Sequence, residues 1–298
     1  MLNKLLFYLV VKPISLLPFW VLHIISDLAK FLIYRVFKYR VGVVMTSLRN
    51  SFPEKSESEL KAIASEFYRH FTDIVIESVK MFSISEKSLA KRMVSMNSEI
   101  FDSYYKEGKD LVLVSGHYGS WEMWATYGAQ HFPHNPRGVY KPLKNKFWDD
   151  QAKKSRGKYG MNLVPVKEAA KQFEIIDEPA AVILLVDQSP ARSKKCYWTT
   201  FLSQDTAVNF GMESIAKKHN AAVIYGDIQK VKRSHYEVTW SVISDDPSSE
   251  PYGMITEKAT AKVEEKVRCN PQYWLWTHKR WKRKRRDDEE LFNVLKGK

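Results

Sequence analysis

A short, wholly apolar run from Leu111 to Val114 is the feature that most constrains the fold of this chain. Asp110 precedes the run, and Ser115–Gly116 follows it. An apolar run of this length, bounded by polar and turn residues, is typical of a strand buried on both faces. A helix-like stretch over residues 120–130 comes directly afterwards. The run therefore predicts an interior strand that passes through a glycine-rich turn into a helix.

Segments of both kinds alternate along the rest of the chain. The clearest helix is expected over residues 56–82, where Ser56 and Glu59 match a capping box and apolar residues recur at helical spacing. Further helices are expected over 145–158, 167–176, 206–220 and 254–267, and further strands over 138–141, 181–186, 221–228 and 236–243. This alternation predicts an α/β fold, with a mixed, partly parallel sheet covered by helices on both faces.

The N-terminus is strongly apolar, and Lys12 is the one charged residue between Leu5 and Ser26. As one helix this stretch would be roughly 33 Å long, close to the hydrocarbon thickness of about 30 Å. Lys12 and Pro13 interrupt it, so spanning a membrane and lying on its surface both stay open. A helix packed on the protein's own core is a further alternative. We expect residues 1–40 to form a hydrophobic membrane-anchor helix and residues 41–298 to form the main domain.

The charge distribution favours an anionic partner. Lys and Arg outnumber Asp and Glu by 47 to 34, for a formal net charge of +13. A basic chain rich in aromatic residues is typical of proteins that meet nucleic acid or an anionic membrane surface. Several basic residues follow the apolar N-terminus, and only Lys4 precedes it, so the positive-inside tendency predicts that the main domain faces the cytoplasm. These residues are Lys30, Arg35, Lys38, Arg40 and Arg49.

The turn after the apolar run carries the candidate chemistry. His117 lies between Gly116 and Gly119, and ligands of open α/β sheets gather beyond the carboxyl ends of the strands. An imidazole, with an unperturbed pKa of about 6.5, is suited to act as general base at neutral pH. Glu122 follows about one helical turn later, where its carboxylate would hold the other ring nitrogen and stabilise the imidazolium. A His and a Glu at this spacing also occur by chance, so the spacing alone leaves catalysis open.

The C-terminal part contains a strongly basic segment, KRWKRKRR at 279–286, with Trp274 and Trp276 just before it. Such a segment could bind single-stranded nucleic acid through phosphate contacts and stacking. No recognisable RNA- or DNA-binding motif accompanies it, so we expect no nucleic-acid partner and expect anionic membrane lipids instead. For residues 284–286 a purely solvated tail is the alternative.

Several short segments occur in one order along the chain: HYGSWE at 117–122, YKPL at 140–143, RGKYG at 156–160, VDQ at 186–188, TFL at 200–202 and QYWLWTHKRWK at 272–282. Together with the hydrophobic N-terminus, this series resembles the lipid A biosynthesis acyltransferase family, the late acyltransferases related to glycerolipid acyltransferases. HYGSWE is similar to the His-x4-Asp/Glu motif of that family. The resemblance covers nearly the whole chain.

The resemblance implies a membrane-bound O-acyltransferase of lipopolysaccharide biosynthesis, held at the inner membrane with its catalytic domain on the cytoplasmic side. An acyl carrier protein would present the fatty acyl chain as a thioester, and a lipid A precursor would supply the acceptor hydroxyl. His117 would be the general base, with Glu122 holding its imidazole. Because the thioester supplies its own activation, no cofactor and no metal ion are expected.

The resemblance also implies residues that bind substrate. Arg156 would clamp a phosphate or the developing oxyanion, unless it lies on the solvated face of a basic helix. Asp187 would position Arg156 or the acceptor, or merely cap the next segment. Arg280 and Lys282 would contact phosphates or carboxylates of the acceptor, and Lys141 stands in the YKPL segment, where an arginine is common in the family.

Two alternatives to this function stay open. The same acyl chemistry could serve another acceptor, either a different glycolipid or an aminolipid. A non-catalytic membrane-binding protein could also have this fold.

Overall fold

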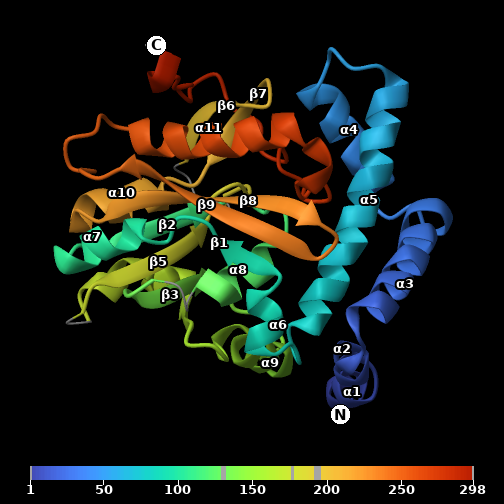
Figure 1. Ribbon diagram of the computed structural model, residues 1–298. Coiled ribbons are helices and arrows are strands. Elements are labelled where there is room, and N and C mark those ends of the chain that lie inside the picture. The colour runs from blue at the N-terminus through green and yellow to red at the C-terminus, as the bar shows by residue number, and fades with distance from the viewer. Residues whose placement is uncertain (1, 129–131, 176–177, 191–195, 297–298) are drawn as a thin grey trace.

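The computed structural model describes residues 2–128, 132–175, 178–190 and 196–296 (Figure 1). The strands among these residues are β1 (Met93–Ser95), β2 (Leu111–Ser115), β3 (Asn135–Tyr140), β4 (Asn162–Pro165), β5 (Ala180–Leu185), β6 (Tyr197–Phe201), β7 (Gln204–Val208), β8 (Ala222–Lys232) and β9 (His235–Ser244). Seven of them form one sheet in the order β1-β9-β8-β2-β5-β3-β4, and β6 and β7 form a separate antiparallel pair.

The helices divide into an N-terminal group and a group within the main domain. The first group is α1 (Leu2–Leu6), η1 (Phe7–Val11), α2 (Lys12–Leu16), α3 (Phe19–Lys30) and η2 (Phe31–Val36). The second is α4 (Val41–Ser51), α5 (Glu57–Lys80), α6 (Glu86–Ala90), α7 (Ile100–Lys106), α8 (Trp121–Gly128), α9 (Lys146–Gly157), η3 (Val166–Phe173), α10 (Gly211–His219), α11 (Met254–Cys269), η4 (Pro271–Tyr273) and η5 (Val294–Lys296).

The predicted interior strand is β2, at the centre of the sheet, and every residue of it is buried. It pairs in parallel with β5 on one side and with β8 on the other. Strands β3 and β4 continue the parallel part, whereas β9 runs antiparallel to β8. The structure thus confirms an α/β fold with a mixed sheet, and the sheet is mostly parallel.

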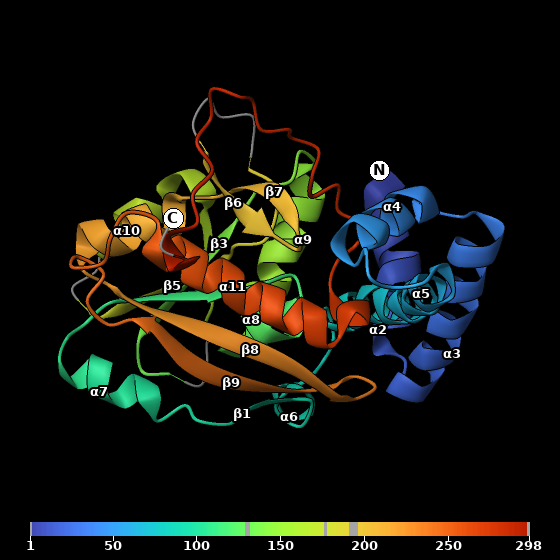
Figure 2. The same ribbon diagram turned by 90° about the horizontal axis from the view of Figure 1, so that it is seen from above.

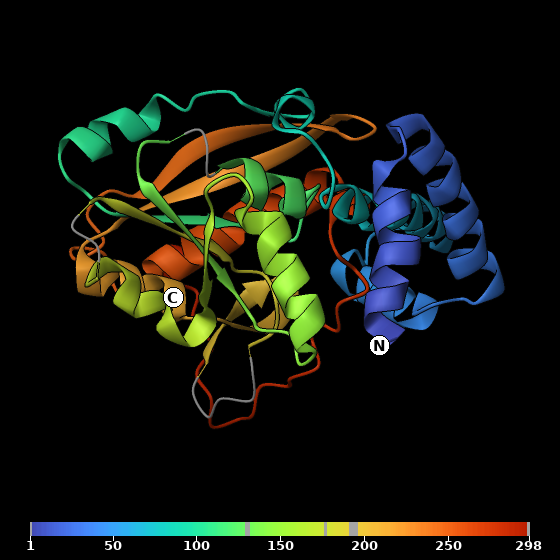
Figure 3. The same cartoon turned by 90° about the horizontal axis from the view of Figure 1, so that it is seen from below.

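Alternate residues of β2 face two different apolar clusters. Val112 and Val114 contribute to a cluster formed with α4, α5, α10 and α11, whereas Leu111 and Leu113 contribute to one formed with α6, α7 and α8. Helix α11 crosses the first face of the sheet (Figures 1 and 2), and α7 and α8 lie on the opposite face (Figure 3). Helices cover both faces, as the alternation of strands and helices predicted.

Helix α5 is the helix predicted over residues 56–82. Its N-cap is Ser56, whose side chain accepts a hydrogen bond from the backbone of Glu59, while the Glu59 side chain accepts one from the backbone N–H of Ser56, 2.8 Å away. The predicted capping box is confirmed. The helix also carries four buried polar residues, His70, Thr72, Asp73 and Glu77.

The N-terminal helices differ from the single helix that was predicted. Residues 2–16 and 19–36 form two helical segments bent by 119° relative to each other. The break lies at Leu17, which has an extended ψ of 148° because the ring of Pro18 disfavours a helical backbone at the residue before it. No described helix is long and apolar enough to cross a membrane alone, although the two bent segments meet that criterion together.

The second N-terminal segment has two distinct faces. One face of α3 packs beside α5 and buries Leu22 and Ser26, whose Oγ donates to Asp73 at 2.8 Å. The opposite face leaves large apolar side chains exposed, among them Trp20 and Ile24. The segment is therefore packed on the protein's own core along one side and open along the other.

The predicted start of the helix over residues 206–220 is wrong. Gln204–Val208 is strand β7, and helix α10 begins only at Gly211. Strand β7 pairs with β6 across a turn at Leu202 and Ser203, both of which have positive φ. Periodicity does not separate a strand this short from the first turn of a helix. The helix predicted over 167–176 is the 3₁₀ helix η3, and residues 129, 130 and 176 of the predicted helices lie outside the described residues.

Candidate active site

Two parallel strands bring His117 and Asp187 together. Strands β2 and β5 pair in register, with Ser115 opposite Leu185 at their carboxyl ends. His117 and Asp187 each follow two residues after these positions, so they leave the sheet side by side. Gly119, in the turn that leads to α8, has a φ of +59°, a conformation that favours glycine.

The carboxylate of Asp187 holds both the ring and the backbone of His117. Oδ1 lies 2.6 Å from Nδ1 of His117, and Oδ2 accepts hydrogen bonds from the His117 backbone N–H at 2.8 Å and from Nε1 of Trp274 at 2.7 Å. Burial alone would raise the pKa of Asp187, but the charge of His117 and these hydrogen bonds lower it to about 2. The carboxylate is therefore ionised at neutral pH and oriented toward the imidazole.

The other ring nitrogen of His117 is oriented by Gln188. The amide Nε2 of Gln188 lies 2.9 Å from Nε2 of His117. Because an ionised carboxylate only accepts, Nδ1 of His117 carries the ring proton toward Asp187, and Nε2 accepts the hydrogen bond from the Gln188 amide. This tautomer leaves a lone pair on Nε2, the form that a general base requires.

Glu122 does not contact the imidazole, which corrects the predicted arrangement. Its carboxylate forms an ion pair with Arg156 through two hydrogen bonds, from Nε at 2.8 Å and from Nη2 at 2.5 Å. Glu122 lies in the first turn of α8, and Arg156 lies in the last turn of the neighbouring helix α9. Asp187, in turn, binds His117 rather than Arg156. The contact of Asp187 with His117 is none of the roles that the sequence left open for Asp187.

The segment after η4 supports the turn that carries His117. Tyr118 and Trp274 form an antiparallel bridge, the Gly119 N–H donates to the carbonyl of Tyr273 at 3.1 Å, and the Leu275 N–H donates to the carbonyl of His117 at 3.2 Å. The role of Trp274 was not predicted from the sequence. The only signal for it was that the residue lies in a segment shared with a known family.

The remaining predicted residues lie in different surroundings. Lys141 follows β3, whose carboxyl end lies at the same edge of the sheet as that of β2, and Lys141 is exposed. Lys282 is also exposed, whereas Arg280 is only 2% exposed and lines a small cavity together with Asp187. Among the described residues no group of three His, Cys, Asp or Glu side chains is arranged to hold a metal ion.

Comparison with known proteins gives one clear match. The model of the family described as bacterial lipid A biosynthesis acyltransferase matches residues 2–283. This range includes the N-terminal helices, the whole sheet and the segment that carries Trp274 and Arg280. No curated protein matches the chain.

Proposed function

Because this chain belongs to the bacterial lipid A biosynthesis acyltransferase family, we propose that it transfers a fatty acyl chain from an acyl carrier protein thioester to a hydroxyl of a lipid A precursor. His117 is the proposed general base. The observation that carries this proposal is the ionised Asp187 on Nδ1 of His117, which places the lone pair of the ring on Nε2. The family match also confirms the resemblance that the ordered motifs indicated.

In the proposed reaction, Nε2 of His117 removes the proton of the acceptor hydroxyl while the oxygen attacks the thioester carbonyl. The new C–O bond forms, the C–S bond breaks, and the leaving thiolate takes the proton from the imidazolium. The products are an ester and a free thiol. Asp187 stabilises the transient imidazolium and keeps the ring in the correct tautomer, as the acidic member of a catalytic triad does. The thioester supplies the driving force, so the scheme needs no cofactor.

We assign the Glu122–Arg156 pair to substrate positioning. The Arg156 side chain is 31% exposed and that of Glu122 is 20% exposed, so the pair faces a partly open region beside α8 and α9. The Arg156 guanidinium has N–H donors that are not bonded to Glu122, and we assign these donors to a phosphate or to the developing oxyanion. In this role Glu122 acts on the reaction by fixing the guanidinium. The exposed cations Lys141 and Lys282 are the proposed contacts for acidic groups of the acceptor.

The N-terminal helices are the proposed membrane contact. Their exposed apolar side chains include Leu5, Leu9, Trp20, Ile24, Leu28, Phe31 and Phe37. The bend at Leu17 and the packing of α3 beside α5 favour helices that lie along the membrane surface with their apolar side inserted. The basic residues that follow them would face anionic headgroups. The proposed location is the inner membrane, with the catalytic domain on its cytoplasmic side.

An acyl-transfer assay tests this function. Membranes containing the protein, an acylated carrier protein and a lipid A precursor should yield a product heavier by one acyl chain in mass spectrometry. The product should disappear in His117→Ala and persist in His235→Ala, a control at the start of β9. Product formed only with another glycolipid or an aminolipid would change the acceptor assignment. Lipid binding without transfer to any acceptor would indicate a non-catalytic membrane-binding protein.

A further inference from the structure

Arg280 has a buried guanidinium with hydrogen-bond donors that have no partner among the described residues, and the charge of the Asp187 carboxylate acts on it. The residue is 2% exposed, and neither Nε nor Nη1 has a hydrogen-bond partner there. Burial lowers the pKa of Arg280 to about 10, so the guanidinium is still protonated at neutral pH. Buried charges are normally paired, because a lone charge loses its hydration without compensation. An unpaired guanidinium of this kind points to a ligand.

Asp187 lies next to Arg280, but both of its carboxylate oxygens already accept hydrogen bonds from other groups. Its Oδ1 is held by the ring of His117, and its Oδ2 by the backbone of His117 and the indole of Trp274. The Asp187 carboxylate is therefore oriented toward the imidazole of His117. No hydrogen bond joins this carboxylate to Nε or Nη1 of Arg280 in the described structure. The Nε and Nη1 donors of Arg280 are left for a group from outside the chain.

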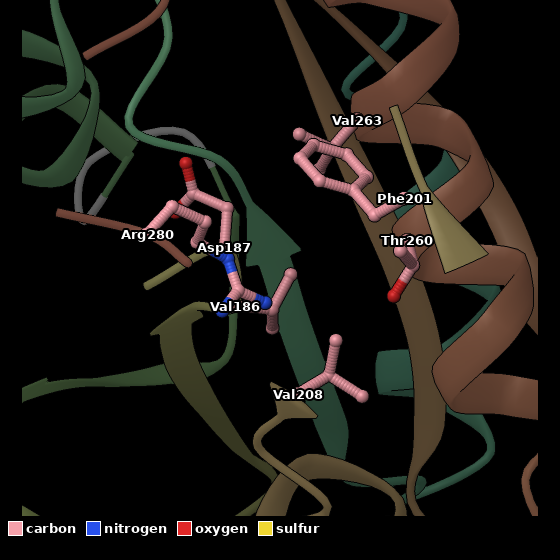
Figure 4. A pocket seen from close by; sticks show the side chains of 7 residues that line it. All are labelled: Val186, Asp187, Phe201, Val208, Thr260, Val263 and Arg280. Atoms are coloured by element: carbon pink, nitrogen blue, oxygen red, sulfur yellow. The ribbon is translucent and has the colours of Figure 1, made fainter. Parts of the chain in front are cut away.

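The guanidinium points into a small, partly open cavity (Figure 4). Val186, Phe201, Val208 and Val263 form its apolar walls. Its volume is about 10 Å³, enough for one water-sized group. An anionic oxygen accepts charge-assisted hydrogen bonds from a guanidinium, which are stronger than the hydrogen bonds that a neutral water would accept.

We propose that this cavity receives one oxygen of a phosphate group on the acyl acceptor. The proposal rests on the proposed function and names a binding subsite for that acceptor. One oxygen enters the cavity, and the other oxygens stay at its mouth. A phosphate is charged before the reaction begins, as is Arg280, so the contact forms on binding. Because the cavity lies beside Asp187, the bound phosphate would hold the acceptor next to His117 and Asp187, the pair that activates the hydroxyl.

A binding test that needs no catalysis uses Arg280→Met, Arg280→Lys and the matched control Lys284→Met, which removes one charge from an exposed position of the same segment. Inorganic phosphate, compared with chloride at equal ionic strength, should raise the melting temperature of the wild type, of Lys284→Met and, less strongly, of Arg280→Lys. Arg280→Met should not respond, and without phosphate it should melt no lower than the wild type, because the buried N–H groups it removes have no hydrogen-bond partner. A lower melting temperature for Arg280→Met, or an equal phosphate response in all variants, would overturn the proposal.

Kinetics then identify the source of the phosphate. With the phosphorylated acceptor, Arg280→Met should raise KM about 10- to 100-fold with kcat little changed. With the same acceptor after enzymatic removal of its phosphate, wild type and variant should have equal KM values. An equal loss with both acceptors would assign the phosphate to the donor, and a loss in kcat alone would assign Arg280 to the oxyanion. Either result contradicts the proposal. If the wild type transfers no acyl chain, the proposed function fails, while the melting experiment still decides the anion site.

Discussion

Oδ1 of Asp187 lies 2.6 Å from Nδ1 of His117, although 70 positions separate the two residues in the sequence. The contact depends on the parallel, in-register pairing of β2 and β5. It gives the imidazole an ionised partner that orients the ring and would stabilise its protonated form. Asp187, rather than Glu122, is therefore the acidic residue whose loss should affect proton transfer.

Replacing Asp187 with Asn should lower kcat by about 10²- to 10⁴-fold, because the amide neither fixes the Nδ1–H tautomer nor stabilises the imidazolium. Steady-state acyl transfer measures this loss. The control is Asp205→Asn, which removes an exposed carboxylate that pairs with Arg285 and should leave kcat unchanged. A loss of less than threefold in Asp187→Asn would contradict the assigned role.

The pair formed by Glu122 and Arg156 predicts coupled effects on substrate use. Glu122→Gln and Arg156→Met should each lower kcat/KM by about 10- to 100-fold. The double variant should have a kcat/KM no lower than that of the less active single variant, because either change disrupts the same ion pair. The nitrogen chemical shifts of the His117 ring, measured by NMR, should be unchanged in Glu122→Gln. Shifted ring signals would show instead that Glu122 acts on the imidazole.

The hydrogen bond from the indole of Trp274 to Asp187 should contribute both to stability and to kcat. Trp274→Phe keeps the ring packing but removes a donor to a buried carboxylate, which should lower the free energy of unfolding by about 1–3 kcal/mol. It should also lower kcat, because Oδ2 of Asp187 then keeps only the backbone N–H of His117.

Trp281→Phe is the matched control for that experiment. Its indole donates to Oγ1 of Thr206, 2.8 Å away, and has no hydrogen bond to Asp187. We expect a loss of stability with kcat unchanged, measured by denaturant unfolding and by acyl transfer. Equal kcat losses in the two variants would mean that the indole of Trp274 acts through packing alone.

Local signals predicted much of the fold. The apolar run that became β2 and the capping box of Ser56 and Glu59 depend on neighbours in the sequence, and both were confirmed. The strand β7 was missed because its partner β6 had not been recognised, and a five-residue segment has no distinctive period of its own.

The site was only partly predictable for a related reason. His117 was identified from the turn that contains it, whereas its partner was assigned to Glu122 by helical spacing. The spacing placed Glu122 correctly on the first turn of α8, but the helix directs this side chain toward Arg156 on α9. The true partner follows a distant strand, and only the register of β5 against β2 identifies it.

His70 predicts how stability depends on pH. This imidazole is buried on α5, and burial, followed by the nearby charge of Lys230, lowers its pKa well below 6.5. The unfolded chain therefore binds the proton more tightly, so the free energy of unfolding should fall as pH falls below about 6.5. One such proton contributes a slope of about 1.4 kcal/mol per pH unit. Denaturant unfolding of His70→Gln between pH 6.5 and 5 should show a slope smaller by about this amount, and an unchanged slope would contradict the assignment.

Gly119 provides a test of the turn that carries His117, with Gly108 as its matched control. Both residues have positive φ, so replacement by Ala should cost each of them about 1 kcal/mol of stability. A Cβ at Gly108 would meet nothing within 4 Å, whereas one at Gly119 would lie 2.8 Å from Cγ2 of Ile228. Gly119→Ala must therefore also displace the turn, which weakens its hydrogen bond to Tyr273 and moves His117. We expect Gly119→Ala to lose more stability than Gly108→Ala and to lose acyl transfer as well. Equal losses of stability with activity retained in both variants would show that the turn accommodates the methyl group.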